Sequence, residues 1–141
     1  MPITTNSDIM WARDVITSDP YIQSLGFTPQ NIVGYKNSGN ELSVNNREIN
    51  LYNVDGDTTR SSITMSMIYE VDIMVSRDYY NIANEAKDQI IALLQTKAEA
   101  NRKRFKLVHP GLTLSVPPTF YGIGIRFSLY ETIFNKIKKE S

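Results

Sequence analysis

Two residue types on which many catalytic and metal sites depend are scarce in this chain of 141 residues. The sequence contains no cysteine and a single histidine. The absence of cysteine excludes disulfides, thiolate catalysis, iron–sulfur clusters and cysteine zinc sites. The lone histidine excludes any site that needs two imidazoles. We therefore expect neither a metal nor a cofactor, and most enzyme classes are excluded.

Long apolar runs and net charge are missing as well. No stretch approaches the roughly 20 apolar residues that a transmembrane helix needs, and residues 1–5 lack the basic start and apolar run of a secretory signal. Fifteen acidic residues balance fifteen basic ones, so the chain is not a polycation of the kind that coats nucleic acid. These features predict a single domain over residues 1–141, made in the cytoplasm, with no membrane partner.

The neutral total hides a separation of charge along the chain. Residues 1–72 carry nine acidic and four basic side chains, whereas residues 73–141 carry six acidic and eleven basic ones. One interpretation is that the basic clusters are solvated helix ends, where cations complement the helix dipole. The other is a contact of opposite charges between identical copies that pack head to tail. The residues expected at such a subunit contact are Trp11, Asp55, Asp57, Arg102, Lys103 and Arg104.

The N-terminal part of the chain predicts an amphipathic helix with an interruption. The helix begins at Asn6 or Ser7, residues that favour the N-cap position. Asp19-Pro20 interrupts it, because proline disfavours helical backbone in the residue before it. One further turn is expected to end at Gly26. Trp11, the single tryptophan, is interpreted as an anchor in the core or at a subunit contact.

Residues 29–60 predict short strands separated by polar turns. Strands are expected at 31–35 and 48–54, and the segment 36–47 between them is rich in Asn, Gly and Ser. That composition predicts a mobile loop or an extended polar hairpin. Asp55-Gly56-Asp57 is expected to form a tight turn between strands.

The clearest pattern is a strict alternation of polar and apolar residues from Ser62 to Ser76. It predicts a long strand with one buried face and one polar face. Such a strand belongs to an antiparallel or mixed sheet that is covered on one side only. A helix capped by Asp78 and ending near Asn101 should follow, with its apolar stripe on the buried face of the strand.

The C-terminal third predicts strands again. Two short strands, 105–108 and 112–116, flank an expected turn at His109–Gly111, and a longer strand covers 120–130. Residues 132–141 are expected to form a basic tail or a short basic helix. The order of helix, strands, helix and strands indicates an α+β fold. Its sheet is expected to be mixed and mainly antiparallel, with two helices packed on one face.

Three features could carry chemistry, and each lacks a necessary part. Glu70 and Asp72 could bind a metal or exchange protons, but no third ligand is placed near them. Arg126 is expected on the same sheet face, where it neutralises them. His109 has no recognisable nucleophile partner. Gly122-x-Gly124 lacks the third glycine of a dinucleotide loop, so these glycines are expected to let another backbone approach closely. No catalytic residue is assigned, and we do not expect an enzyme.

The order and periodicity of these elements resemble the tail terminator, or tail completion, proteins of long-tailed bacteriophages, the lambda gpU-like and head–tail joining group. The likeness covers about residues 7–132 and includes Val71–Val75, the helix that opens at Asp78, and Ile123–Leu129. The resemblance implies a structural protein of the virion tail or neck. It forms a hexameric ring that caps the tail tube, stops its polymerisation and joins it to the head.

The resemblance also implies a set of partners. These are further copies of the chain, the tail tube protein, the head–tail connector or neck protein and, as a further candidate, the tail sheath. DNA would pass through the ring without sequence-specific contacts. The residues expected to face that lumen are Ser66, Glu70, Asp72, Arg126 and Ser128. Two alternatives stay open: another tail subunit of the tube or baseplate, and a phage-encoded nucleic-acid-processing factor such as a nuclease.

Overall fold

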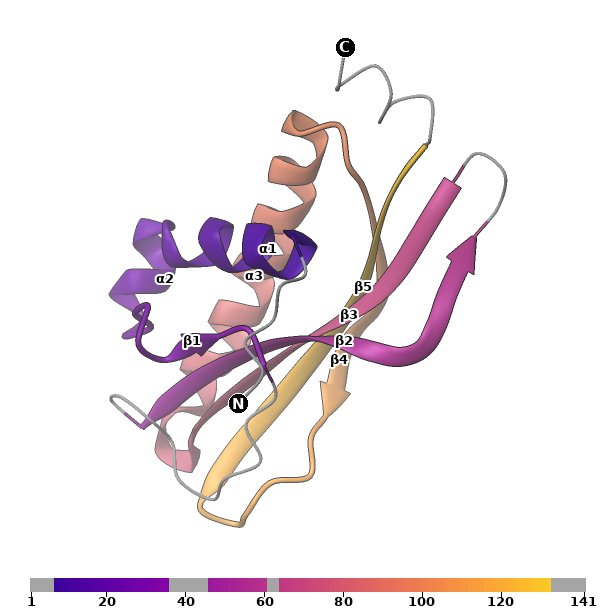
Figure 1. The fold of residues 1–141 in the computed structure, drawn as a ribbon. Helices are drawn as coiled ribbons and strands as arrows, with labels where there is room; N and C mark the ends of the chain where they lie inside the picture. The colour runs from indigo at the N-terminus through magenta and orange to yellow at the C-terminus, as the bar shows by residue number, and fades with distance from the viewer. Residues whose placement is uncertain (1–6, 36–45, 61–63, 133–141) are drawn as a thin grey trace.

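The computed structural model describes residues 7–35, 46–60 and 64–132 (Figure 1). The elements, in chain order, are α1 (Ser7–Thr17), α2 (Pro20–Ser24), β1 (Ile32–Val33), β2 (Arg47–Arg60), β3 (Thr64–Ser76), the 3₁₀ helix η1 (Arg77–Tyr79), α3 (Tyr80–Ala100), β4 (Arg104–Thr113) and β5 (Phe120–Thr132).

The strands form one five-stranded sheet in the order β1-β2-β3-β5-β4. β1 runs parallel to β2, and every other neighbouring pair is antiparallel. The helices lie on one face of this sheet, with α1 crossing in front of the longer α3 (Figure 1). The predicted α+β fold with a mixed, mainly antiparallel sheet is therefore confirmed.

The N-terminal helices follow the predicted pattern. Ile9, Ala12 and Ile16 are buried, at the three- and four-residue spacing that places them on one helix face. The chain then starts a new helix, because the side chain of Asp19 accepts a hydrogen bond from the backbone N–H of Ile22 at 3.0 Å. Pro20 suits the first position of α2, where its missing N–H has no helical partner.

Helix α3 packs its apolar stripe on the buried face of β3, as predicted. Its buried residues are Ala83, Ala86, Ile90, Leu94 and Ala98, and the facing residues of β3 are Tyr69, Val71, Ile73 and Val75. The predicted cap is wrong, because Asp78 lies within η1 and Tyr79 takes the cap position without a side-chain hydrogen bond. The small alanines on this stripe let the helix approach the sheet closely.

Two segments that were expected to be turns are parts of strands. Residues 55–57 lie within β2, where the pairing with β3 shifts between Asn53 and Thr58. His109–Gly111 lies within β4, where the pairing with β5 shifts on both sides of His109. Both strands lie at edges of the sheet for most of their length, where bulges and a proline are tolerated because no second neighbour needs their hydrogen bonds.

Several predictions concern residues outside the described part. The expected loop at 36–47 lies outside it except for Asn46 and Arg47, and the basic tail lies outside it after Thr132. Asn6 lies outside it too, while Ser7 begins α1. None of the helices in the described ranges combines the length and the apolar character needed to cross a membrane.

Candidate functional site

The face of the sheet that points away from the helices carries a group of polar side chains from three adjacent strands. We call this group the polar cluster. Its members are Glu48, Asn50, Tyr52, Glu70, Asp72 and Arg126. The register places Asn50 opposite Asp72, and Glu70 between its two cross-strand partners, Tyr52 of β2 and Arg126 of β5. Directly opposed residues share a face of the sheet, so these side chains meet.

Tyr52 lies between the two carboxylates of β3. Its hydroxyl oxygen is 2.6 Å from Oε2 of Glu70 and 2.7 Å from Oδ2 of Asp72. A phenol carries one proton, so it can fully donate to only one of the two carboxylates at a time. The hydroxyl group therefore couples Glu70 to Asp72, and the two carboxylates compete for the same donor.

Arg126 completes the contact from the other side of β3. Its Nε donates to Oε1 of Glu70 at 2.7 Å, which confirms the predicted pairing across the strands. Burial by itself raises the pKa of Glu70, but hydrogen bonds with Asp72, Tyr52 and Arg126, together with the guanidinium charge, outweigh burial and lower it. Glu70 is therefore ionised at neutral pH.

Tyr52 shows the opposite shift. Burial, followed by its hydrogen bonds to Glu70 and Asp72, raises the pKa of Tyr52 above its ordinary value of 10.0. The phenol is a permanent donor at neutral pH, while Glu70 is a permanent acceptor. Because neither group titrates near neutrality, these two do not have the pKa expected of a general acid or base. The arrangement holds β2, β3 and β5 together.

Gly124 of β5 provides the space in which the Asp72 carboxylate of the polar cluster lies. A Cβ atom at this position would lie 2.9 Å from Oδ1 of Asp72 and 3.2 Å from Cδ2 of Leu114. The missing side chain thus leaves room for the Asp72 carboxylate and for Leu114, which folds over from the segment after β4. The expectation that a backbone fills this space is wrong for Gly124, since the atoms that fill it belong to side chains.

The lumen-facing expectation rested on an exposed polar face. Glu70, Asp72 and Ser128 are only 4%, 5% and 7% exposed, so these three side chains do not form the solvated surface that this expectation assumes. At Glu70 and Asp72, hydrogen bonds from Tyr52 and Arg126 take the place of the water that was expected there. The side chain of Arg126 is 41% exposed and still reaches solvent. The side chain of Ser66 lies outside the described part.

The residues expected at a subunit contact have different surroundings. The Nζ atom of Lys103 lies 3.1 Å from Oδ1 of Asp8 and 5.6 Å from the centre of the Trp11 ring. Lys103 thus makes an ion pair within its own chain and is not the exposed cation that the sequence indicated. Trp11 is partly buried against the core. Arg102 and Arg104 are exposed, and the side chains of residues 55–60 lie outside the described part.

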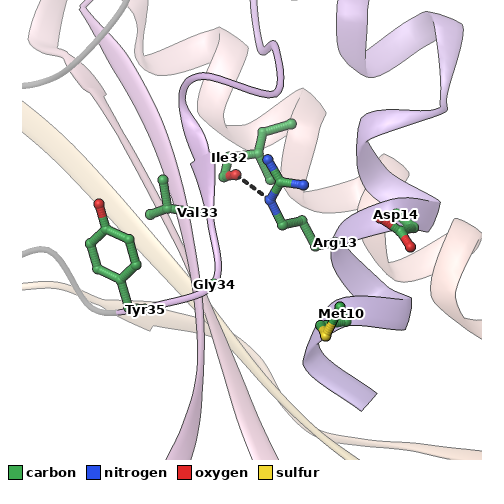
Figure 2. A pocket seen from close by; sticks show the side chains of 7 residues that line it. All are labelled: Met10, Arg13, Asp14, Ile32, Val33, Gly34 and Tyr35. Atoms are coloured by element: carbon green, nitrogen blue, oxygen red, sulfur yellow. Dashed lines mark hydrogen bonds between the residues drawn. The ribbon is translucent and has the colours of Figure 1, made fainter. Parts of the chain in front are cut away.

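A groove lies between α1 and β1 (Figure 2). It has a volume of about 290 Å³ and is lined by Met10, Arg13, Asp14, Ile32, Val33, Gly34 and Tyr35. Arg13 bridges its two walls, because its Nε donates to the carbonyl oxygen of Ile32 at 2.7 Å. A second groove of about 360 Å³, between α1 and α3, is lined by Trp11, Asp14, Val15, Ser18, Asp19, Pro20, Leu93 and Lys97. In the groove between α1 and β1, the guanidinium of Arg13 is hydrogen-bonded to backbone carbonyl oxygens. That groove therefore offers mainly apolar contacts to a ligand.

Within residues 7–35, 46–60 and 64–132, the two edges of the sheet have few strand partners. β1 covers only Ile49 and Asn50 of β2, so the rest of β2 forms one edge. β4 forms the other edge, where Arg104, Lys106 and Val108 are exposed. An open edge presents backbone N–H and C=O groups that can pair with a strand of another chain. The sequence did not predict one continuous edge strand here, because a turn was expected at His109–Gly111, within β4.

No known family model and no curated protein sequence matches this chain. Within residues 7–35, 46–60 and 64–132, no three histidine, aspartate or glutamate side chains are grouped closely enough to hold a metal ion.

Proposed function

We propose that this chain is a structural subunit of a ring at the tail–neck junction of a long-tailed bacteriophage. The ring would cap the tail tube, stop its growth and join it to the connector of the head. This proposal extends the resemblance in element order to the tail terminator group. The observation that carries it is the sheet itself, which has helices on one face and long open edges along β2 and β4.

Open edges on opposite sides are what a ring-forming subunit needs. A closed ring uses two different surfaces on each subunit, and the two surfaces must fit each other after rotation about the ring axis. β2 and β4 are separated by β3 and β5, so they can contact two different neighbours at once. Through strand pairing alone, a subunit with one such edge could form only a pair.

The polar cluster supports a mechanical role. Tyr52, Glu70 and Arg126 come from three strands and hold one another through hydrogen bonds of 2.6 and 2.7 Å. Hydrogen bonds to charged groups are stronger than neutral ones, so they resist shear between the strands. A rigid sheet suits a subunit whose edges must meet those of its neighbours. We assign no catalytic step to these residues.

The first test is the size and shape of the particle. We expect negative-stain images and light scattering of the purified protein, alone and with purified tail tubes, to show rings of about six copies. The rings should sit at tube ends and prevent addition of further tube subunits. A particle that stays monomeric under both conditions contradicts the proposal.

The nuclease alternative has its own test. Divalent-metal-dependent cleavage of DNA by the wild type, lost in Asp72→Asn, would favour it over the structural role. Ring formation should be measured on the same variant, because a misfolded protein loses both properties. On the structural proposal, neither the wild type nor Asp72→Asn cleaves DNA.

A further inference from the structure

The strand register shows which parts of the two open edges lie at the same level of the sheet. Lys106 of β4 pairs with Ser128 of β5, and Ser128 pairs with Ile68 of β3. Ile68 falls in the register shift of the β2–β3 pair, so residues 54–57 of β2 lie opposite it. Lys106 and the stretch 54–57 are therefore at one level, on opposite edges of the sheet.

The neighbouring register gives the same alignment. Arg104 pairs with Tyr130, Tyr130 with Ser66, and Ser66 with Thr59 of β2. The regular part of β4, Arg104–Leu107, thus spans the same level as the outer half of β2. This part of β4 carries two basic residues, while the stretch 54–57 contains two aspartates.

We infer that the regular part of β4 in one copy pairs with the outer half of β2 in a second copy, with Lys106 against the acidic stretch 54–57. The inference rests on the proposed ring and names the contact that closes it. Opposite charges across adjacent strands favour this contact.

Strand direction permits this contact. β2 and β5 run in one direction, and β3 and β4 run in the other. When a second copy is placed beside the first without being inverted, its β2 runs antiparallel to β4. The pairing is therefore a continuation of the sheet, and every copy keeps the same orientation relative to the ring axis.

The irregularity in β4 limits the contact. The pairing with β5 shifts at His109, and Pro110 follows it. A bulge and a proline on an edge strand block further pairing. The new ladder would therefore end near Leu107, which fixes its register and prevents unlimited growth along the edge.

A cysteine pair provides the decisive test, because the chain has no cysteine of its own. We would introduce Lys106→Cys and Asp57→Cys together and oxidise the protein mildly. Within one chain these positions are separated by three strand spacings, or about 14 Å, which is beyond the reach of a disulfide. Between copies, opposed residues of an antiparallel pair are about 5 Å apart. We expect a ladder of covalent oligomers that reducing agent collapses.

Lys97→Cys combined with Asp57→Cys is the matched control. Lys97 is an exposed lysine on α3, away from the edge. We expect its cross-linked fraction to be at least about tenfold lower than that of the edge pair. Equal cross-linking of the two pairs would indicate random collisions and overturn the inference.

A charge exchange tests the same contact without cysteines. Lys106→Glu alone and Asp57→Lys alone each place like charges at every contact, so we expect each to weaken self-association about tenfold. An equal mixture of the two variants restores opposite charges in an alternating ring and should recover assembly. Recovery in the mixture is not expected if the two positions do not meet.

The outcomes separate the inference from the proposed function. Rings that form normally, yet show neither the cross-link nor the charge effect, overturn the β4–β2 contact and leave the ring proposal standing. Absence of any ring, alone or on tail tubes, overturns the proposed function. The expected result is a ring, the specific cross-link and recovery in the mixture.

Discussion

Ile73 and Asp72 are neighbours in β3 and point to opposite faces of the sheet, yet both are almost fully buried. Ile73 is 0% exposed and Asp72 is 5% exposed. On the helix-covered face, burial removes apolar surface from water, and the gain depends mainly on area. On the other face, burial would be costly without the hydrogen bonds of the polar cluster. The apolar face therefore depends on the area and packing of its side chains, and the polar face depends in addition on hydrogen-bond partners.

A polar face of a sheet is therefore not always a solvated face. In the polar cluster, Tyr52 and Arg126 provide the hydrogen bonds that water would otherwise make to Glu70 and Asp72. The stability of this face therefore depends on the protonation of its carboxyl groups and on hydrogen-bond geometry. The stability of the apolar face does not depend on protonation. Substitutions on the two faces should consequently lower the free energy of unfolding by different amounts. The losses should differ more clearly in their dependence on pH.

The largest effect is expected on the apolar face. Ile73→Ala removes a fully buried side chain between β3 and the helices, which should lower the free energy of unfolding by about 3 to 4 kcal/mol. The loss should be the same at pH 7 and at pH 4, because no titratable group is involved. Urea unfolding followed by Trp11 fluorescence measures it. Val108→Ala, at an exposed position, is the control and should stay within about 0.5 kcal/mol of the wild type.

On the polar face, Tyr52→Phe should cost about 2 kcal/mol at pH 7, because Glu70 and Asp72 lose a shared donor while remaining buried. In acid Glu70 gains a proton of its own, so the loss should shrink below the ordinary glutamate pKa of 4.5. Unfolding measured from pH 7 to pH 3 tests this. Tyr80→Phe, at an exposed tyrosine, should show little change at any pH. A Tyr52→Phe cost that does not vary with pH would remove the contrast between the faces.

The fold could be predicted because its signals are periodic. The alternation in β3 and the spacing in α3 each repeat over many residues, so one misplaced side chain does not change the interpretation. Turns depend on two or three residues. Residues 55–57 and His109–Gly111 have the composition of turns, but the strands on either side continue through them as bulges, and only tertiary pairing decides between the two.

The polar cluster was only half predictable. The pairing of Arg126 with Glu70 followed from their shared face, but the burial of Glu70 and Asp72 did not, because charged residues on a sheet face are usually solvated. The signal that could have indicated it was Gly124, on the same face as the two acids. A glycine at such a position leaves space for a neighbouring side chain, but sequence alone does not show which chain segment enters that space.

Gly124→Ala tests how closely the polar face is packed. The new methyl group would lie 2.9 Å from Oδ1 of Asp72, so either the carboxylate or the backbone must shift, at a cost of about 1.5 kcal/mol. Gly111→Ala is the matched control, because its new methyl group would lie 3.5 Å from Cδ1 of Ile123, an ordinary contact. Thermal unfolding of the two variants compares them directly. Equal midpoints would show that the polar face adapts as easily as a surface.

The smallest and most specific effect is expected at Arg126. Arg126→Gln removes the guanidinium from Glu70 but keeps a hydrogen-bonding side chain, and the arginine is 41% exposed, so we expect a loss of about 1 kcal/mol at pH 7. Its pH dependence follows from the lowered pKa of Glu70. A carboxyl group whose pKa is lower in the folded than in the unfolded chain stabilises the fold above its unfolded value, and this stabilisation is lost as the pH falls through the folded value.

The wild type should therefore keep the Arg126 contribution from neutral pH down to about pH 4.5, the ordinary value for glutamate, and lose it below that. The difference between wild type and Arg126→Gln should shrink toward zero over the same range. Arg102→Gln removes one charge at an exposed position and should show no such convergence. A difference that instead grows in acid would contradict the lowered pKa of Glu70 and the role of Arg126 in lowering it.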